Sequence, residues 1–146
     1  MKENAYIDRY TSGLSDDDIS SKLSNPFLEL LGARLVEWKQ GYAEMTLPIS
    51  PTLKNRSGAV QGGVLCTLLD ATGGYAGLYS PPGETKVHGL TVSLAVNFIA
   101  NGQGSILTSK GFIDKAGTSV YFAHSEVWLD ANILLATAIG SYRYLA

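Results

Sequence analysis

One apolar segment near the middle of the chain constrains the fold more than any other feature. Residues 61–79 carry a single charged side chain, Asp70. Apolar or small residues recur there at helical spacing, with Val64, Ala71 and Tyr75 widening a stripe formed by Leu65, Leu68, Leu69, Thr72, Ala76 and Tyr79. The pattern predicts a largely buried helix of about five turns. Because such a helix must be covered on most sides, the rest of the chain has to wrap around it.

The segments on either side of this helix have mainly the pattern of β-strands, and these strands could cover the helix. Upstream, a short helix over 27–31, capped by Asn25-Pro26 and ended by Gly32, precedes a hairpin of strands 33–39 and 42–47. Downstream, four long strands are predicted at 90–99, 105–114, 119–129 and 133–144, joined by short connections. We therefore expect an α+β domain, with a curved antiparallel sheet of five or six strands around one central helix.

Composition limits the size and the partners of this domain. The 146 residues predict a polar segment over 1–24, in which Asp16 to Asp18 are suited to begin a helix, and a single domain over 25–146. Charged residues make up only 16% of the chain, against about 25% in an average soluble protein. So little charge favours a surface hidden against further copies of the chain, and we expect an oligomer. A net charge of −2 argues against nucleic-acid binding.

The numbers of cysteines and histidines and the length of the apolar runs exclude several further classes of protein. The single cysteine, Cys66, excludes an intrachain disulfide and a cysteine-rich zinc site, and suits a reducing cytoplasm. The two histidines show no metal-ligand spacing, so we expect neither a metal nor another cofactor. No apolar run reaches the roughly 18 residues of a membrane span, and no signal sequence is evident at the N-terminus. We therefore expect a cytoplasmic protein without membrane contact.

The residues best suited to chemistry lie at the start and in the middle of the predicted helix. Gln61 is followed by Gly62 and Gly63, and two glycines let a ligand approach free backbone amides closely. Asp70 lies among apolar residues, where a carboxylate is costly to bury unless it is partnered or used. A purely structural interpretation stays open for both features. The two glycines could serve only to let the helix pack closely, and the Asp70 carboxylate could simply be hydrogen-bonded by neighbouring donors.

Spacing links the two features to a second chain. Nine residues separate Gln61 from Asp70, which is about 13.5 Å along one helix. The start of the helix and its own carboxylate are therefore too far apart to grip one small reacting group. If both act on one substrate, the carboxylate comes from a partner chain whose helix runs antiparallel.

The run from Asn55 to Tyr75 resembles the hotdog-fold thioesterases, the phenylacetate-degradation type in particular. That group typically shows an Asn, six residues to a His-Gly-Gly, and nine residues from the His to an Asp in the buried helix. Here the residues are Asn55, Gln61, Gly62, Gly63 and Asp70. The later run 91–98 also resembles the strand after the helix, and the order of elements matches over about residues 25–145. The resemblance implies a hotdog fold.

What the resemblance implies for function is hydrolysis of an acyl-CoA thioester without a metal. The amide of Gly62 would polarise the thioester carbonyl, Asp70 of the partner subunit would act as general base or nucleophile, and Asn55 would bind the carbonyl or position water. Thr91 falls where the family often has a hydroxyl that orients water. Substrate-binding candidates are Gln61, Gly63, Lys54 and Arg56, the two cations being placed for the CoA phosphates. The resemblance also implies a homodimer, with a homotetramer by pairing of dimers.

Two further interpretations stay open at the level of sequence. Glutamine at position 61 hydrogen-bonds but cannot shuttle a proton near neutral pH, which favours a non-catalytic acyl-CoA binding or sensing module as the second interpretation. A hydratase of related fold is the third, although it would call for a histidine at the start of the helix. Cys66 is expected to be a buried thiol rather than a nucleophile, and His124 a sheet residue. His88 is expected to be a loop residue, with a role at the pocket as the minor alternative. The acyl group would lie in a tunnel to which Tyr75, Leu69 and Phe98 contribute.

Overall fold

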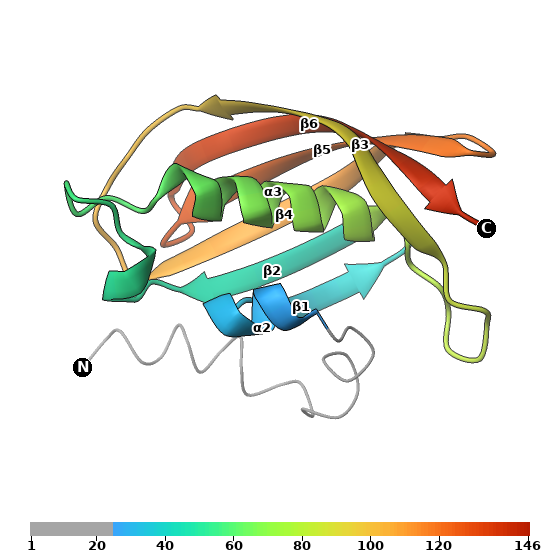
Figure 1. Ribbon diagram of the computed structural model, residues 1–146, viewed down its shortest axis with the longest axis horizontal. Coiled ribbons are helices and arrows are strands. Elements are labelled where there is room, and N and C mark those ends of the chain that lie inside the picture. The colour runs from blue at the N-terminus through green and yellow to red at the C-terminus, as the bar shows by residue number, and fades with distance from the viewer. Residues whose placement is uncertain (1–24) are drawn as a thin grey trace.

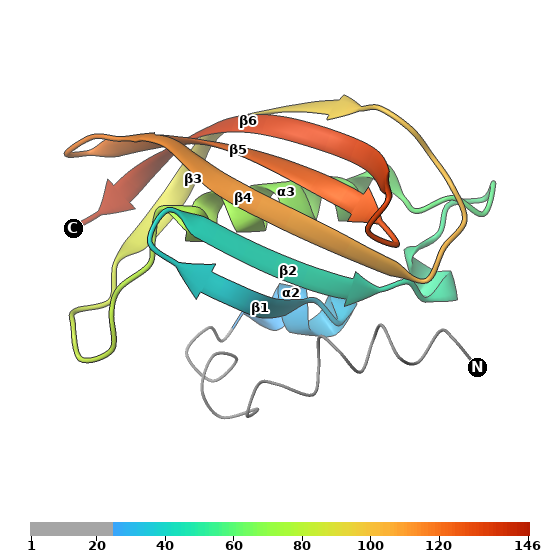
Figure 2. The ribbon, with the colours of Figure 1, turned by 180° about the vertical axis from the view of Figure 1, so that it is seen from behind.

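A single helix, α3 (Gly62–Ala76), lies along the concave face of a six-stranded antiparallel sheet in the computed structural model, which describes residues 25–146 (Figures 1 and 2). The strands lie in the order β1-β2-β4-β5-β6-β3, and α3 contacts every one of them. The remaining elements are α2 (Pro26–Leu31), β1 (Arg34–Lys39), β2 (Tyr42–Pro48), η2 (Pro51–Leu53), β3 (His88–Phe98), β4 (Ile106–Ala116), β5 (Val120–Leu129) and β6 (Ile133–Leu145). The predicted curved sheet around one helix is confirmed. The segment 1–24, with the helix start expected at 16–18, lies outside the described residues.

The central helix is shorter than the pattern predicted. It begins after Gln61 as N-cap and ends at Ala76, so Tyr79 falls beyond it. Tyr121 of β5 packs against this end, and the backbone at Gly77 passes so close to its ring that a Cβ there would collide with it. Tyr121 also donates a hydrogen bond of 2.7 Å to the carbonyl of Gly74 in the last turn. Tyr121 thus ties the last turn of the helix to the sheet.

Leucine packing and a few buried hydroxyls lock the helix to the sheet. The core includes Leu47, Leu65, Leu68, Leu69, Leu107, Val127, Leu129 and Leu135. Ser125 donates to the carbonyl of Leu69 at 2.9 Å, and the hydroxyls of Thr72 and Ser109 lie 2.8 Å apart. At Gly111 the strand β4 approaches so closely that a Cβ would collide with the backbone of Thr72. A helix held in this way can keep its polar residues in fixed positions.

Two edge strands bound the sheet, and β3 is the longer and the more exposed of the two. Leu90, Val92 and Phe98 on β3 are 58%, 63% and 58% exposed. A long edge strand with apolar side chains is normally paired or covered, because its free backbone groups otherwise invite other chains. The expectation of an oligomer, which would cover this edge, remains a prediction.

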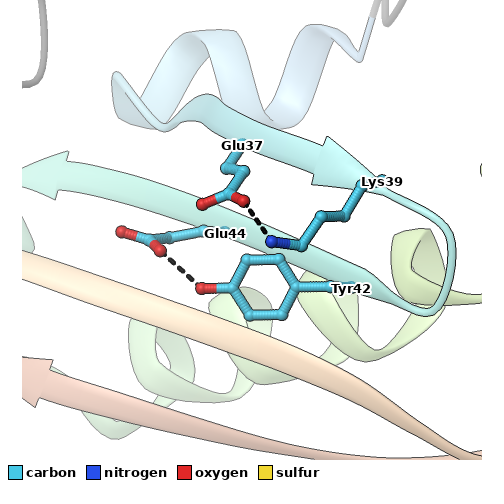
Figure 3. Close-up of polar contacts among 4 residues, drawn as sticks. All are labelled: Glu37, Lys39, Tyr42 and Glu44. Atoms are coloured by element: carbon cyan, nitrogen blue, oxygen red, sulfur yellow. Dashed lines mark hydrogen bonds and ion pairs between the residues drawn. The ribbon is translucent and has the colours of Figure 1, made fainter.

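The β1–β2 hairpin carries a group of polar contacts that stabilises the other edge (Figure 3). Glu37 and Glu44 are direct cross-strand neighbours, an arrangement of like charges that is unfavourable on its own. Lys39 forms an ion pair of 2.6 Å with Glu37, and the hydroxyl of Tyr42 donates to Glu44 at 2.5 Å. Each carboxylate therefore has its own partner.

Among residues 25–146, no helix is both long and apolar enough to cross a membrane.

Candidate functional site

Asp70 and Thr91 form the best-defined polar pair of the candidate site. The hydroxyl of Thr91 donates to Oδ1 of Asp70 at 2.6 Å. Thr91 is the cross-strand neighbour of Tyr142, whose ring packs beneath α3 at Gly73, so both side chains lie on the helix-facing side of the sheet. The pair thus joins the middle of α3 to the first half of the edge strand β3, and its position follows from strand register.

Two pockets meet at this pair. The first has a volume of about 430 Å³ and includes Trp38, Ala71, Tyr75 and Leu78 in its lining. The second, of about 380 Å³, is lined by Phe27, Leu28, Cys66, Thr67 and Leu94. Asn25, Asp70 and Thr91 line both. A carboxylate between two adjoining pockets can face the reacting bond of a substrate that extends to either side.

The phenols behind the helix stay protonated beside this carboxylate. Burial chiefly, with a smaller contribution from the negative charge of Asp70, raises the pKa of Tyr142 above its ordinary value. Burial also raises the pKa of Tyr121, ahead of contributions from Tyr142, Tyr144 and Asp70. Both phenols are therefore neutral at physiological pH, and neither competes with the carboxylate as a proton acceptor there.

The N-terminus of α3 forms the second part of the candidate site. The amide of Gly62 opens the helix and so has no carbonyl one turn earlier to bond. The side chain of Gln61 makes no capping bond to the helix, and its own backbone N–H bonds to the carbonyl of Leu53 at 2.8 Å. A Cβ on Gly62 would lie 3.3 Å from the Phe98 ring, whereas the space at Gly63 is open. This end of α3 therefore suits a carbonyl or an anion.

Asn55 has a structural task that its predicted role did not include. Its side-chain oxygen accepts from the amides of Ser57 and Ala59 at 2.9 and 3.2 Å, which shapes the loop before α3. The carboxamide oxygen is thus already bonded, and the NH₂ group is the part left to meet a substrate. Lys54 and Arg56 flank Asn55 and are both exposed.

Within one chain the two parts of the site are not brought together. Asp70 and Gly62 lie on one continuous helix, eight residues and so about 12 Å apart along its axis. Neither pocket at Asp70 is lined by Gln61, Gly62 or Gly63. The structure therefore groups Asp70 with Thr91, and Gln61, Gly62 and Gly63 with the loop of Lys54, Asn55 and Arg56.

Several neighbouring residues differ from their predicted positions. Cys66 was expected to be buried, and this was wrong, because its side chain is partly exposed and lines the second pocket one turn before Asp70. His88 lines the first pocket but opens β3 rather than lying in a loop. Leu69 is fully buried in the core and lines neither pocket, whereas Tyr75 lines the first.

The remaining residues to report are His124, Trp38 and the possible metal ligands. His124 lies in β5, as predicted, where it contacts Asp114 at 2.5 Å. Trp38 was not singled out from the sequence, and its only signal was an aromatic residue in a half-buried strand. Within the described residues no group of three or more His, Cys, Asp or Glu side chains could hold a metal ion.

Comparison with known proteins identifies the fold. No family model matches the chain. A protein of Saccharolobus solfataricus, provisionally named an esterase, is 26% identical over 124 residues, which are 85% of this chain and 86% of that protein. A thioesterase family protein from Silicibacter pomeroyi has a TM-score of 0.75 and 25% identity, covering 86% of this chain and 93% of its own.

Two more distant structures share the same fold. PaaI from the phenylacetic acid degradation operon of E. coli has a TM-score of 0.75 at 16% identity and covers 87% of this chain and 89% of its own. Thioesterase HI1161 from Haemophilus influenzae reaches 0.78 at 15% identity, with 93% and 94% covered. The chain thus has the hotdog fold of these thioesterases, as the sequence resemblance implied.

Proposed function

We propose that this hotdog-fold chain hydrolyses acyl-CoA thioesters to the free acid and CoA, in sites shared between two antiparallel subunits. The observation that carries the proposal is the carboxylate of Asp70, held by Thr91 where two pockets meet. An acyl-CoA thioester extends in two directions from its carbonyl carbon, with the acyl group on one side and CoA on the other. The two pockets that meet at Asp70 offer a place for each group. The thioesterase family protein from Silicibacter pomeroyi and the Saccharolobus solfataricus protein provisionally named an esterase support the reaction class.

The proposed reaction uses Asp70 in one of two ways. As general base, the carboxylate takes a proton from water while the water oxygen attacks the carbonyl carbon. The C–S bond then breaks, and the proton passes to the thiolate. As nucleophile, Asp70 attacks the carbonyl carbon, the C–S bond breaks and the CoA thiolate leaves, which gives a mixed anhydride of Asp70 and the acyl group. Water then hydrolyses the anhydride to the free acid and the Asp70 carboxylate, and a proton released in this step passes to the thiolate. Thr91 uses its one O–H to hold the carboxylate, and its lone pairs can accept from the attacking water.

The N-terminus of α3 from the partner subunit would stabilise the negative charge that develops on the carbonyl oxygen. The free amide of Gly62 is the proposed donor, since helix N-termini favour anions. Gln61 and Asn55 offer amide donors beside it, and Gly63 leaves room for the substrate. Lys54 and Arg56, exposed on the preceding loop, are proposed to bind the CoA phosphates. The site needs no metal.

The first test replaces Asp70 with asparagine and measures thiol release from a panel of acyl-CoA esters. Asp70→Asn keeps the shape of the side chain and removes the base, so we expect kcat to fall about 10²–10⁴-fold. Asp114→Asn is the matched control, because Asp114 lies on β4 beside His124 and lines neither pocket. Full turnover by Asp70→Asn would reject this mechanism.

Two further outcomes separate the remaining possibilities. Single turnover in ¹⁸O-water labels the Asp70 carboxylate only if Asp70 attacks directly and water then opens the anhydride at the aspartyl carbonyl, so a labelled Asp70 identifies the nucleophile. A folded wild-type protein that binds acyl-CoA but never releases thiol would instead support the binding module, which Gln61 at the helix N-terminus favours.

A further inference from the structure

Asn25 lies at the junction of the two pockets, together with the proposed catalytic pair. Among the described residues the two linings share three members, Asn25, Asp70 and Thr91. They come from three separate elements, since Asn25 precedes α2, Asp70 lies in the middle of α3 and Thr91 lies on β3. All three are polar. The proposed reaction uses Asp70 and Thr91, which leaves Asn25 as the shared residue without a role.

The side-chain oxygen of Asn25 is already bonded to the helix that follows it. Asn25 is the N-cap of α2, with φ −124° and ψ 97°, and its Oδ1 accepts from the amide of Leu28 at 3.2 Å. Its backbone carbonyl accepts from the amide of Glu29 at 3.0 Å. Leu28 is only 7% exposed, so the first turn of α2 is anchored in the protein interior. These contacts restrict the orientation of the Asn25 carboxamide.

The NH₂ group of the same carboxamide remains available. Within residues 25–146 it has no hydrogen-bond partner, although Asn25 is half-buried. A cap requires only an acceptor oxygen, which serine or aspartate supplies about equally well. Asparagine differs from both because the same group also carries two N–H donors. The capping role therefore explains the oxygen of Asn25 and leaves its NH₂ group for a bound molecule.

The three shared residues complement one another as hydrogen-bonding groups. Ionised Asp70 only accepts, and Thr91, whose O–H is given to Asp70, has lone pairs left to accept. Asn25 is the one of the three with free donors. A water molecule that donates its two O–H groups to Asp70 and Thr91 and accepts from the Asn25 NH₂ keeps one lone pair. That lone pair is the one that attacks a carbonyl carbon.

We propose that Asn25 is a further catalytic residue, whose side-chain NH₂ holds the attacking water beside Asp70. This inference rests on the proposed thioester hydrolysis. With Asp70 as base, the water oxygen bonds to the carbonyl carbon and its proton passes to Asp70; the C–S bond then breaks and the thiolate takes that proton. With Asp70 as nucleophile, the same water attacks the anhydride. Asn25 gains and loses no proton in either route.

The variants Asn25→Ser and Asn25→Asp test this role, because both keep a capping oxygen and remove the NH₂ group. We expect each to lower kcat about 10-fold to 100-fold, with KM nearly unchanged and the urea unfolding midpoint at its wild-type value. Asn132→Ser is the matched control and should keep the wild-type rate, since Asn132 is exposed in the turn between β5 and β6 and lines neither pocket.

Two results of this comparison would overturn the proposal. If Asn25 serves only as a cap, both variants turn over as fast as the wild type. A loss of rate confined to Asn25→Asp would come from the added negative charge beside Asp70, and not from the missing donor.

A double-variant cycle tests whether Asn25 and Thr91 act on the same water. Thr91→Val removes the hydroxyl that accepts from this water. If one water is held by both residues, Asn25→Ser should lower kcat clearly less in the Thr91→Val background than in the wild type, because the water is already misplaced. Two residues that support activity independently would instead multiply their losses, and that result contradicts the shared water.

The outcomes separate this inference from the proposed reaction. If Asp70→Asn abolishes turnover while Asn25→Ser and Asn25→Asp retain it, hydrolysis by Asp70 stands and the role of Asn25 is refuted. If the wild type releases no thiol from any ester of the panel, the proposed reaction is refuted and the role of Asn25 falls with it.

Discussion

Thr91 orients the proposed catalytic carboxylate through one hydrogen bond of 2.6 Å to Asp70. Thr91→Val keeps the shape of the side chain and removes that donor. We expect kcat to fall about 10-fold to 100-fold while KM changes little, because a misplaced catalytic group loses rate rather than substrate binding. Steady-state kinetics on an accepted acyl-CoA measures both constants.

Restoring the hydroxyl provides the control for this prediction. Thr91→Ser puts back the donor without the methyl group and should recover most of the rate. A merely structural role for Thr91 would instead make Val and Ser equally harmful, or would change unfolding midpoint and kcat together. Wild-type kcat in Thr91→Val would show that the bond to Asp70 is irrelevant to turnover.

Tyr42 illustrates how a single residue makes stability depend on pH. Burial first, then its hydrogen bond to Glu44, raises the pKa of the Tyr42 phenol above its ordinary value near 10. Above pH 10 the unfolded chain therefore loses this proton before the folded protein does. The free energy of unfolding must then fall as pH rises, by no more than about 1.4 kcal/mol per pH unit for one phenol and by less where water reaches it.

The variant Tyr42→Phe isolates this contribution. Urea unfolding between pH 9 and 11.5 should show a shallower loss of stability for Tyr42→Phe than for the wild type, with the two curves differing in slope above pH 10. The remaining slope belongs in part to Tyr121, Tyr142 and Tyr144, whose pKa values are also raised by burial. Parallel curves throughout this range would contradict the assignment.

The helix α3 allows its first amide to be removed without removing the helix. Proline is favoured at the first helical position, where its missing N–H has no intrahelical partner. Gln61, with φ −60° and ψ 133°, already has the extended backbone that must precede a proline. We expect Gly62→Pro to fold and to lose about 10²–10³-fold in kcat, as when one donor to a developing oxyanion is lost.

Gly62→Ala is the matched variant, because it adds a Cβ as proline does but keeps the N–H. Both place a Cβ about as close to the Phe98 ring, 3.3 Å in the present geometry, so the steric effect of the Cβ is shared. Gly62→Ala should therefore retain most of the activity. Equal rates for the two variants would show that the amide does not act on the substrate, and circular dichroism would verify that α3 remains intact.

The elements show what a sequence can and cannot predict. The apolar stripe predicted α3, and the alternating strands predicted the sheet, because both patterns depend on local periodicity. The end of α3 at Ala76 was missed, because the apolar stripe continues to Tyr79 and the contact of Tyr121 from β5 with the last turn is not visible in a local pattern. The partial exposure of Cys66 was also missed, since it depends on the second pocket that lies between α3, α2 and β3.

The candidate site was also predicted only in part, because local motifs can be read from the sequence and contacts between distant segments cannot. Motif spacing pointed to Asp70 and Gly62, and Thr91 was placed by resemblance. The bond between Thr91 and Asp70 depends on the register of β3 against β6, which no local pattern reveals. The role of the Asn55 oxygen in its own loop, and the position of Trp38 beside Tyr75, are likewise properties of the folded chain.

At the scale of the whole molecule, the separation of Asp70 from Gly62 makes a dimer part of the proposed chemistry. Each site would combine Asp70 of one subunit with Gly62 of the partner subunit. Asp70→Asn and Gly62→Pro then damage opposite halves of a site, and each variant alone should lose about 100-fold or more in activity and is nearly inactive. A heterodimer of the two contains one site with both defects and one site with neither.

Mixing the two inactive variants therefore gives a test that a single-chain site cannot pass. If equal amounts dissociate and reassort at random, half of the dimers are mixed and each has one intact site, so activity should reach about a quarter of the wild-type value. The same proteins mixed without dissociation should stay inactive, which controls for contamination. A site built within one chain would yield no recovery under either condition, because every chain in the mixture still carries its own defect.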